Sequence, residues 1–315
     1  MLTTVLLRRL IFSIPTLLGV ATLAFMLGHM SPGDPAIAAM GLDLEGYSSV
    51  EPEELERVRE ELGLNKPILV QYVGWLTRAL QGDFGTSYVS TIEVSELVFE
   101  ALPTTMLLLV MTMSVSIVVG ISLGIVSAVF KGRTSDYIAR MIAIIGVSTP
   151  TFWFALVLML CFAVAIPIFP VNGSFDEFGW KAMALPTMAI ALHPAALIAR
   201  MMRSSMLEVL SHDMIRTATA KGLSRWRVYM VHGLRNAINP VITVIGFQFA
   251  NLMGGAVAVE FIFSLPGLGS LLIEGIYEKD ILVIQGAVLV IGVAFALSNL
   301  LVDLLYMIID PRIRI

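Results

Sequence analysis

Long apolar runs separated by short polar segments follow one another along most of the chain. A helix needs roughly 20 mostly apolar residues to cross a bilayer, and six runs come close to that length or exceed it. These runs are Leu10–Met30, Thr104–Phe130, Ile138–Phe169, Ala182–Met201, Val241–Phe263 and Ile281–Ile309. The pattern predicts an all-α, polytopic membrane protein with six transmembrane helices.

Prolines interrupt two of the six runs. The third run is longer than one crossing and contains Pro150, so we expect an interfacial helix that turns into the membrane at that residue. The fourth run contains Pro186 and the pair His193-Pro194, which makes it the weakest candidate span.

The polar segment 31–102 divides the chain into three parts. Residues 1–30 hold the N-terminal cytoplasmic residues and the first span, residues 31–102 form an extracytoplasmic loop, and residues 103–315 form a five-helix core. The first run follows Arg8 and Arg9, as the apolar part of a signal peptide does. It is longer than the ~7–15 apolar residues of a cleavable signal, so we expect an uncleaved span.

Helix signals occur inside the 31–102 loop. A proline followed by acidic residues predicts a helix start at Pro52, and a glycine predicts its end at Gly63. Pro67 begins a second helix that closes near Gly82, and a third short helix leads into the second span. We therefore expect a small helical cap on the membrane surface.

Composition supports a membrane protein and excludes several kinds of site. The chain is 57% hydrophobic and only 14% charged, whereas a soluble domain has about a quarter charged residues. Its one cysteine, Cys161, lies in an apolar run and excludes both an internal disulfide and a thiolate metal cluster. We expect no metal site and no nucleic-acid partner.

Basic residues gather in alternate polar segments, which sets the orientation. If the N-terminus is inside, the cytoplasmic segments and span edges hold Arg8, Arg9, Lys131, Arg133, Arg140, Arg200, Arg203, Arg216, Lys221, Arg225, Arg227, Arg235, Arg312 and Arg314, and the outer segments hold Arg57, Arg59, Lys66, Arg78, Lys181 and Lys279. This asymmetry satisfies the positive-inside rule. It predicts an even number of spans, with both termini in the cytoplasm.

The segment 202–240 is the longest basic interruption in the second half of the chain. Because apolar runs flank it on both sides, a basic segment of this kind should face the cytoplasm and meet a partner protein there. The alternative is an ordinary basic loop that rests on anionic lipid headgroups.

Turn residues predict two helices within the 202–240 segment. Asp213 can cap the first helix and Ser224 the second. Gly222 permits the sharp reversal between them, and the second helix is expected to end before Pro240. Small side chains at positions 217–220 would let the first helix fit a groove on another protein.

Two of the apolar runs carry small residues at four-residue spacing, which lets helix backbones approach closely in lipid. The second run carries Ser116, Gly120, Gly124 and Ala128, and the fifth carries Gly246, Ala250, Gly254 and Ala258. The stripes can serve internal packing, or at least one of them can pack against a partner subunit.

The segment that begins at Asp213 and ends at Pro240, DMIRTATAKGLSRWRVYMVHGLRNAINP, resembles the cytoplasmic coupling loop of permease subunits in binding-protein-dependent ABC importers. The form is the one used by the dipeptide and oligopeptide branch. The general importer pattern is Glu-Ala-Ala, three residues, then Gly. Ala218 and Gly222 match it, whereas Arg216 and Thr217 depart from it as is usual in the peptide branch. Further motifs that carry the resemblance are Ser31-Pro32-Gly33-Asp34-Pro35, Gly82-Asp83-Phe84-Gly85, Thr149-Pro150-Thr151-Phe152-Trp153, the run from Glu260 to Gly269, and Asp310-Pro311-Arg312.

The resemblance implies a pore subunit in a bacterial inner membrane that moves short peptides or related solutes inward. In such importers a second, homologous permease completes the pore, two cytoplasmic ATPases bind ATP and Mg²⁺, and an extracytoplasmic binding protein delivers the solute. The resemblance places the ATPase contact at Asp213, Arg216, Thr217, Ala218, Thr219, Ala220, Lys221, Gly222, Leu223, Ser224, Arg225 and Arg227. The solute remains open among di- and oligopeptides, glutathione, murein peptides and nickel chelates.

The chain contains no G-x-x-x-x-G-K-[ST] motif and no catalytic constellation. We therefore expect no ATPase activity, no enzymatic activity and no cofactor bound by this chain itself. The alternative function is a proton-coupled secondary transporter that uses His193 and Asp303. Asp303 would instead have a structural role if it formed an ion pair with Arg140 or Arg200.

Ionisable and amide side chains inside the runs are candidates for a pathway or gate. These candidates are His193, Gln248, Asn251 and Glu260. Each also has a structural reading, since His193 can satisfy carbonyls freed by the proline beside it, and the amides can bond between helices.

Overall fold

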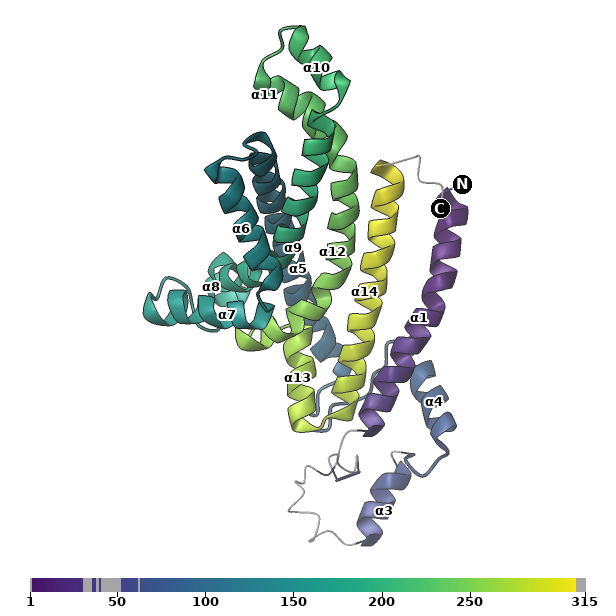
Figure 1. Cartoon of the computed structure of the whole chain (residues 1–315). Coiled ribbons are helices and arrows are strands. Elements are labelled where there is room, and N and C mark those ends of the chain that lie inside the picture. The colour runs from purple at the N-terminus through teal and green to yellow at the C-terminus, as the bar shows by residue number, and fades with distance from the viewer. Residues whose placement is uncertain (1, 31–35, 38–39, 41–51, 62, 310–315) are drawn as a thin grey trace. The chain divides into compact units, whose positions relative to one another are not determined.

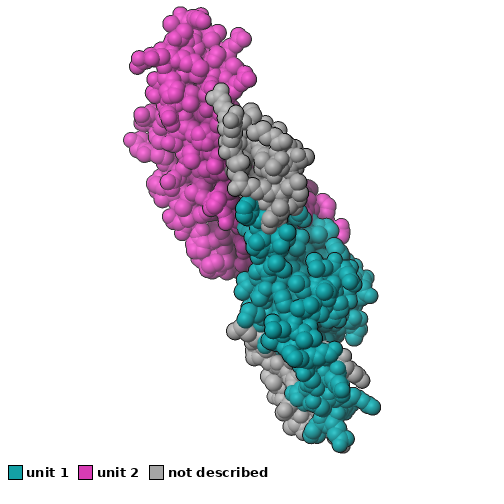
Figure 2. Space-filling model, turned by 90° about the vertical axis from the view of Figure 1, so that its right-hand side faces the viewer, with its two compact units in different colours: residues 1–105, 266–297 teal, residues 106–265, 298–315 magenta. Residues whose placement is uncertain are grey.

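The computed structural model describes residues 2–30, 36–37, 40, 52–61 and 63–309 (Figure 1). These residues are helical apart from turns, loops and one antiparallel bridge between Thr86 and Glu93, so the all-α class is confirmed. The sequence motifs at 31–35 and 310–312 lie outside the described residues. The chain forms two compact units, coloured separately in Figure 2: Met1–Thr105 with Pro266–Leu297, and Met106–Leu265 with Ser298–Ile315.

The first unit contains α1 (Leu2–Met30), α3 (Pro52–Glu61), α4 (Ile68–Leu80), the beginning of α5 (Val94–Val129), α13 (Leu268–Glu278) and most of α14 (Ile281–Ile309). The second unit contains the rest of α5, α6 (Thr134–Ser148), α7 (Thr151–Met159), a π-helical segment (Leu160–Ala165), α8 (Phe175–Phe178), α9 (Trp180–Leu210), α10 (Asp213–Ala220), α11 (Arg225–Arg227), a second π-helical segment (Val228–Leu234) and α12 (Arg235–Ile262).

Three helices are long and apolar enough to cross a membrane: α5, α9 and the 281–300 part of α14. The number of candidate spans rises to five if each of two bent helix pairs counts as one. In α1 the apolar stretch is the shorter Phe12–Leu27. A polytopic helical membrane protein follows, with three to five candidate spans among the described residues.

The helix ends predicted in the 52–82 region are confirmed. Helix α3 begins at Pro52, and the chain beyond it turns at Gly63 with φ +68. Pro67 lies at the N-cap of α4, with an extended ψ of 139. The third short helix is not separate, because it is the first part of α5 and continues without a break into the span.

The break in the third run is confirmed. Helix α6 meets the helix Thr151–Ala165, which consists of α7 and the first π-helical segment, at 107°, with Thr149 and Pro150 between them. Thr149 has an extended backbone (φ −88, ψ 124) because the ring of a following proline excludes the helical conformation. One proline thus converts an apolar run into two helices of different direction.

The predicted break in the fourth run is wrong. Helix α9 runs unbroken from Trp180 to Leu210, with Pro186 and Pro194 inside it. It is the most deeply buried of the three long apolar helices, since 72% of its apolar stretch is buried. Packing against α6, α7 and α12 supports the helix on several sides, which offsets the backbone hydrogen bonds that the prolines remove.

The predicted helix end before Pro240 is also wrong. Helix α9 continues to Leu210, and the helix that begins at Arg225 continues through the second π-helical segment into α12, with Pro240 inside. The part that connects α9 to this helix consists of residues 211–224. A π-helical turn often marks a functional region within a helix.

The stripe of small residues in α5 serves internal packing. A Cβ added at Gly120 would lie 2.7 Å from Cβ of Ile198, and one added at Gly124 would lie 2.5 Å from Cβ of Met202. Ser116 Oγ donates a hydrogen bond to the carbonyl of Ala191 at 3.3 Å. Small side chains therefore let α5 approach α9 closely along their shared length.

The stripe in α12 has a different environment. Gly254 and Ala258 are exposed, and a Cβ added at Gly254 would meet no atom within 4 Å. A side chain at position 254 would therefore begin in open space, without contact to another described part of the chain.

Candidate functional site

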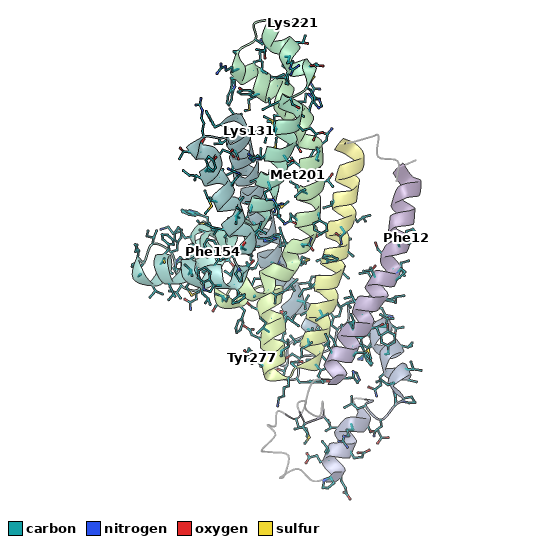
Figure 3. The ribbon with its side chains drawn as sticks, viewed as in Figure 1. Phe12, Lys131, Phe154, Met201, Lys221 and Tyr277 are labelled. Carbon is teal, nitrogen blue, oxygen red and sulfur yellow. The ribbon has the colours of Figure 1, made fainter. Side chains whose placement is uncertain are left out.

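The candidate coupling element is a helical hairpin made of α10, the turn 221–224 and α11. It extends beyond the ends of α9 and α12 (Figure 1), and Lys221 lies at its tip (Figure 3). Gly222 has φ +78, the left-handed region that glycine enters without strain, so the predicted reversal is confirmed.

The caps of the two hairpin helices agree only in part with the prediction. The Ser224 side chain caps α11 by accepting from the Arg227 backbone N–H at 3.4 Å, as predicted. Asp213 is not the cap of α10, because His212 occupies that position without a side-chain hydrogen bond. Asp213 instead lies in the first turn, where a carboxylate suits the helix dipole, and it pairs with Arg216 at 3.3 Å.

An apolar core fixes the hairpin to the long helices of its unit. Ile215 and Ala218 are each 7% exposed and belong to the same buried cluster as Met206 and Val209 of α9. The cluster also contains Val228 and, from α12, Ala237 and Val241. Since one face of α10 is buried with both neighbouring helices, a displacement of the hairpin must act on α9 and α12.

The opposite face of the hairpin is open. Exposed positions include Asp213, Arg216, Thr217, Thr219, Ala220, Lys221, Gly222, Ser224, Arg225 and Arg227, whereas Leu223 is half-buried. The structure thus brings the predicted contact residues together on one element, except that Ala218 faces its core. Trp226 is 71% exposed beside two arginines, and periodicity did not single it out because it belongs to no apolar face.

A buried carboxylate below the hairpin was not predicted as a site. Asp136 is 1% exposed and receives a bidentate pair from Arg203, whose Nε lies 3.0 Å from Oδ1 and Nη2 3.1 Å from Oδ2. Arg140 adds an ion pair at 3.4 Å, and Ser127 Oγ donates at 2.6 Å. Together with the N–H of Gly132, these groups tie the ends of α5 and α6 to α9.

The spacing of Asp136 and Arg140 was the available sequence signal, because residues four apart share a helix face. The sequence instead offered Arg140 as a partner for Asp303. The described partner of Arg140 is Asp136, and the side chain of Asp303 lies outside the described residues.

The four pathway candidates have separate environments. Gln248 is buried and lines an open groove of about 830 Å³ with Arg140, Arg200 and Arg203. Glu260 is fully buried near the end of α12, and His193 is half-buried in α9. Asn251 is exposed and donates to the carbonyl of Phe247 at 2.8 Å. A pathway role for these four residues stays a prediction.

Metal chemistry has no candidate cluster in the part of the chain that the structure describes, where no group of three or more His, Cys, Asp or Glu side chains could hold an ion. Cys161 is exposed on the first π-helical segment.

Comparison with known proteins gives the same class along the whole chain. The family model described as "Binding-protein-dependent transport system inner membrane component" matches residues 120–315, and a model for the N-terminal part of such membrane components matches residues 1–109. A solved structure described as an amino acid ABC transporter with histidines covers 67% of this chain and 94% of its own, with a TM-score of 0.51 and 14% identity, which supports the fold alone.

Two relatives match along nearly their full lengths. A Brucella melitensis protein named for a peptide transport system permease is 41% identical over 100% of this chain and 99% of the relative. A Salmonella typhimurium protein named as a glutathione transport system permease is 41% identical over 98% of each chain. The family match and these full-length identities show that the chain belongs to the family of binding-protein-dependent transport system inner membrane components.

Proposed function

We propose that the protein is a pore-forming permease subunit of an ABC importer, which moves short peptides or related solutes inward. The names of the two relatives support this solute class, since one refers to peptides and the other to glutathione, itself a short peptide. The energy comes from ATP hydrolysis on separate ATPase subunits, which hold ATP and Mg²⁺. This chain contributes no ATPase site, and its sequence carries no phosphate-binding loop.

The observation that carries the proposal is the hairpin 213–227. It has one open face with exposed arginines and an exposed tryptophan, and one face that shares a core with α9 and α12. An element of this kind can receive a push from another protein and pass it to the spans as a rigid-body movement. The ATPase is the partner that we assign to the open face.

The oligomeric and membrane arrangement follows from the same reading. A second, homologous permease would pack against the exposed part of the α12 stripe, at Gly254 and Ala258, and an extracytoplasmic binding protein would deliver the solute. Counting α1 and both bent pairs as spans gives six crossings in the inner membrane. Both termini and the hairpin would then lie in the cytoplasm, with the 31–102 segment outside as a helical cap, in line with the distribution of basic residues.

Solute uptake in reconstituted liposomes separates this function from proton coupling. We expect the initial rate of labelled dipeptide uptake to require ATP and a hydrolysis-competent ATPase, because this chain only transmits the conformational change. Dissipating the proton gradient with an ionophore at constant ATP should leave the rate unchanged. The proton-coupled mechanism through His193 and Asp303 predicts the opposite result. The ionophore would then abolish uptake, and uptake would continue with an inactive ATPase.

A further inference from the structure

The first unit holds a pocket that transport through the pore does not explain. It has a volume of about 440 Å³ and lies between the end of α1, the turn before α4, α4 itself and the beginning of α14. The polar side chains that line it are His29, Lys66, Gln71, Arg78, Tyr88 and Gln285. We call it the α4 pocket. No acidic side chain is among the described residues that line it.

Trp75 is a buried donor in this lining. Its side chain is 4% exposed and packs against Phe25, with 5.8 Å between ring centroids. Its indole N–H is buried and has no hydrogen-bond partner among the described residues. Leaving a buried N–H unsatisfied is unfavourable, so this group would gain from an acceptor supplied by a ligand of the pocket.

The remaining groups of the lining also favour an anion. Lys66 and Arg78 form no ion pair within the described part of the chain, although both side chains line the pocket. The Gln71 amide is already used, because its Nε2 donates to the carbonyls of Leu64 at 2.9 Å and Lys66 at 2.8 Å. His29 is used as well, with its two ring nitrogens against the Phe25 carbonyl at 2.9 Å and Gln71 Oε1 at 3.2 Å, and Gln285 Nε2 donates to the Phe25 carbonyl at 3.4 Å. The fixed charges that remain in the lining are those of Lys66 and Arg78, and both are positive.

Tyr88 adds a further donor of the same kind. Burial raises the pKa of Tyr88 to about 12, and the nearby Asp280 carboxylate contributes in the same direction. The phenol is protonated at neutral pH, as an unperturbed tyrosine also is. Asp280 does not line the pocket and is fully buried. Its carboxylate accepts hydrogen bonds from Ser87 Oγ at 2.6 Å and from the Tyr88 backbone N–H at 3.0 Å.

The helix that lines the pocket has an apolar outer face. Ile68, Leu69, Val73 and Leu80 are each at least 57% exposed. A helix with one packed face and one exposed apolar face is suited to the membrane interface, where tryptophan and tyrosine also prefer to lie. An anion bound beside this face would therefore meet acyl chains as well as donors.

We propose that the α4 pocket binds the phosphate of an anionic phospholipid of the phosphatidylglycerol class, with its acyl chains along the outer face of α4. Lys66 and Arg78 supply the charge and Trp75 donates to a phosphate oxygen. The apolar face favours a lipid over a soluble anion, because a soluble anion would gain nothing from exposed leucine and isoleucine side chains.

Quenching of Trp75 by brominated lipids tests this binding directly. The chain has four tryptophans, so Trp153→Phe, Trp180→Phe and Trp226→Phe together leave Trp75 as the only one. The full-length variant is placed in nanodiscs that contain either dibromo-phosphatidylglycerol or dibromo-phosphatidylcholine. We expect the phosphatidylglycerol to quench at a lower mole fraction, with an apparent preference of roughly fivefold for each basic residue that contacts the phosphate.

The double variant Lys66→Gln, Arg78→Gln should remove the preference for phosphatidylglycerol. Because both side chains are exposed, the substitutions should not disturb folding. Arg57→Gln, an exposed arginine of α3 that does not line the pocket, is the matched control and should retain it. Equal quenching by both lipids in the parent, or an unchanged preference in the double variant, would overturn the proposal. A third outcome would assign the pocket to the solute instead. In that case both lipids quench Trp75 equally, and the fluorescence of Trp75 changes only when a dipeptide is added.

Discussion

Replacement of Asp136 by alanine is expected to lower the free energy of unfolding by about 3 kcal/mol, the lower part of the range for breaking a buried ion pair. The change leaves Arg203 partly buried without its bidentate partner, and it leaves the Ser127 hydroxyl and the Gly132 N–H without their acceptor. The measurement is the denaturation midpoint of the detergent-solubilised protein in a chemical denaturant.

Asp213→Ala is the matched control for this change. Asp213 also pairs with an arginine, but both side chains are exposed, so its loss should cost only about 0–1 kcal/mol. Equal stability of the two variants would contradict the assignment of Asp136 as the group that ties α5 and α6 to α9.

Gly222→Val is expected to leave membrane insertion and assembly intact but to lower the uptake rate by roughly tenfold, the factor that corresponds to 1.4 kcal/mol. A Cβ at this position would meet no atom within 4 Å, so the change creates no clash. Its cost is in the backbone, because φ +78 is strongly disfavoured for a β-branched residue. The turn should therefore relax and misdirect the hairpin while the core beneath it persists.

The measurement is solute uptake per ATP hydrolysed by the assembled transporter. Gly222→Asn provides the control, since asparagine tolerates the left-handed region and should retain most of the uptake. Wild-type coupling in the valine variant would show that the shape of this turn does not transmit the movement.

Local chemistry was predictable from the sequence. The bend at Pro150, the reversal at Gly222 and the cap at Ser224 each depend on the conformational limits of a single residue and its neighbours. The charge distribution likewise singled out the segment that contains the hairpin, because basic residues between two spans are uncommon except on the cytoplasmic side.

Features that depend on tertiary packing were not predictable in the same way. The prolines of α9 suggested a broken span, but burial among neighbouring helices keeps the helix continuous. The pairing of Asp136 with Arg203 spans 67 residues, and no local pattern indicates it. The two stripes of small residues look alike in the sequence, yet the α5 stripe packs inside the chain while Gly254 of the other is exposed.

Crosslinking from the open face of the hairpin to the ATPase tests the central claim most directly. In a Cys161→Ser background, Thr219→Cys is labelled with a photoactivatable maleimide in the assembled transporter, and Lys181→Cys, a position predicted on the opposite side of the membrane, is the control. The account predicts a covalent adduct between this chain and one ATPase subunit from position 219 and none from position 181. No adduct from position 219 in a transporter that retains ATP-driven uptake would contradict the account.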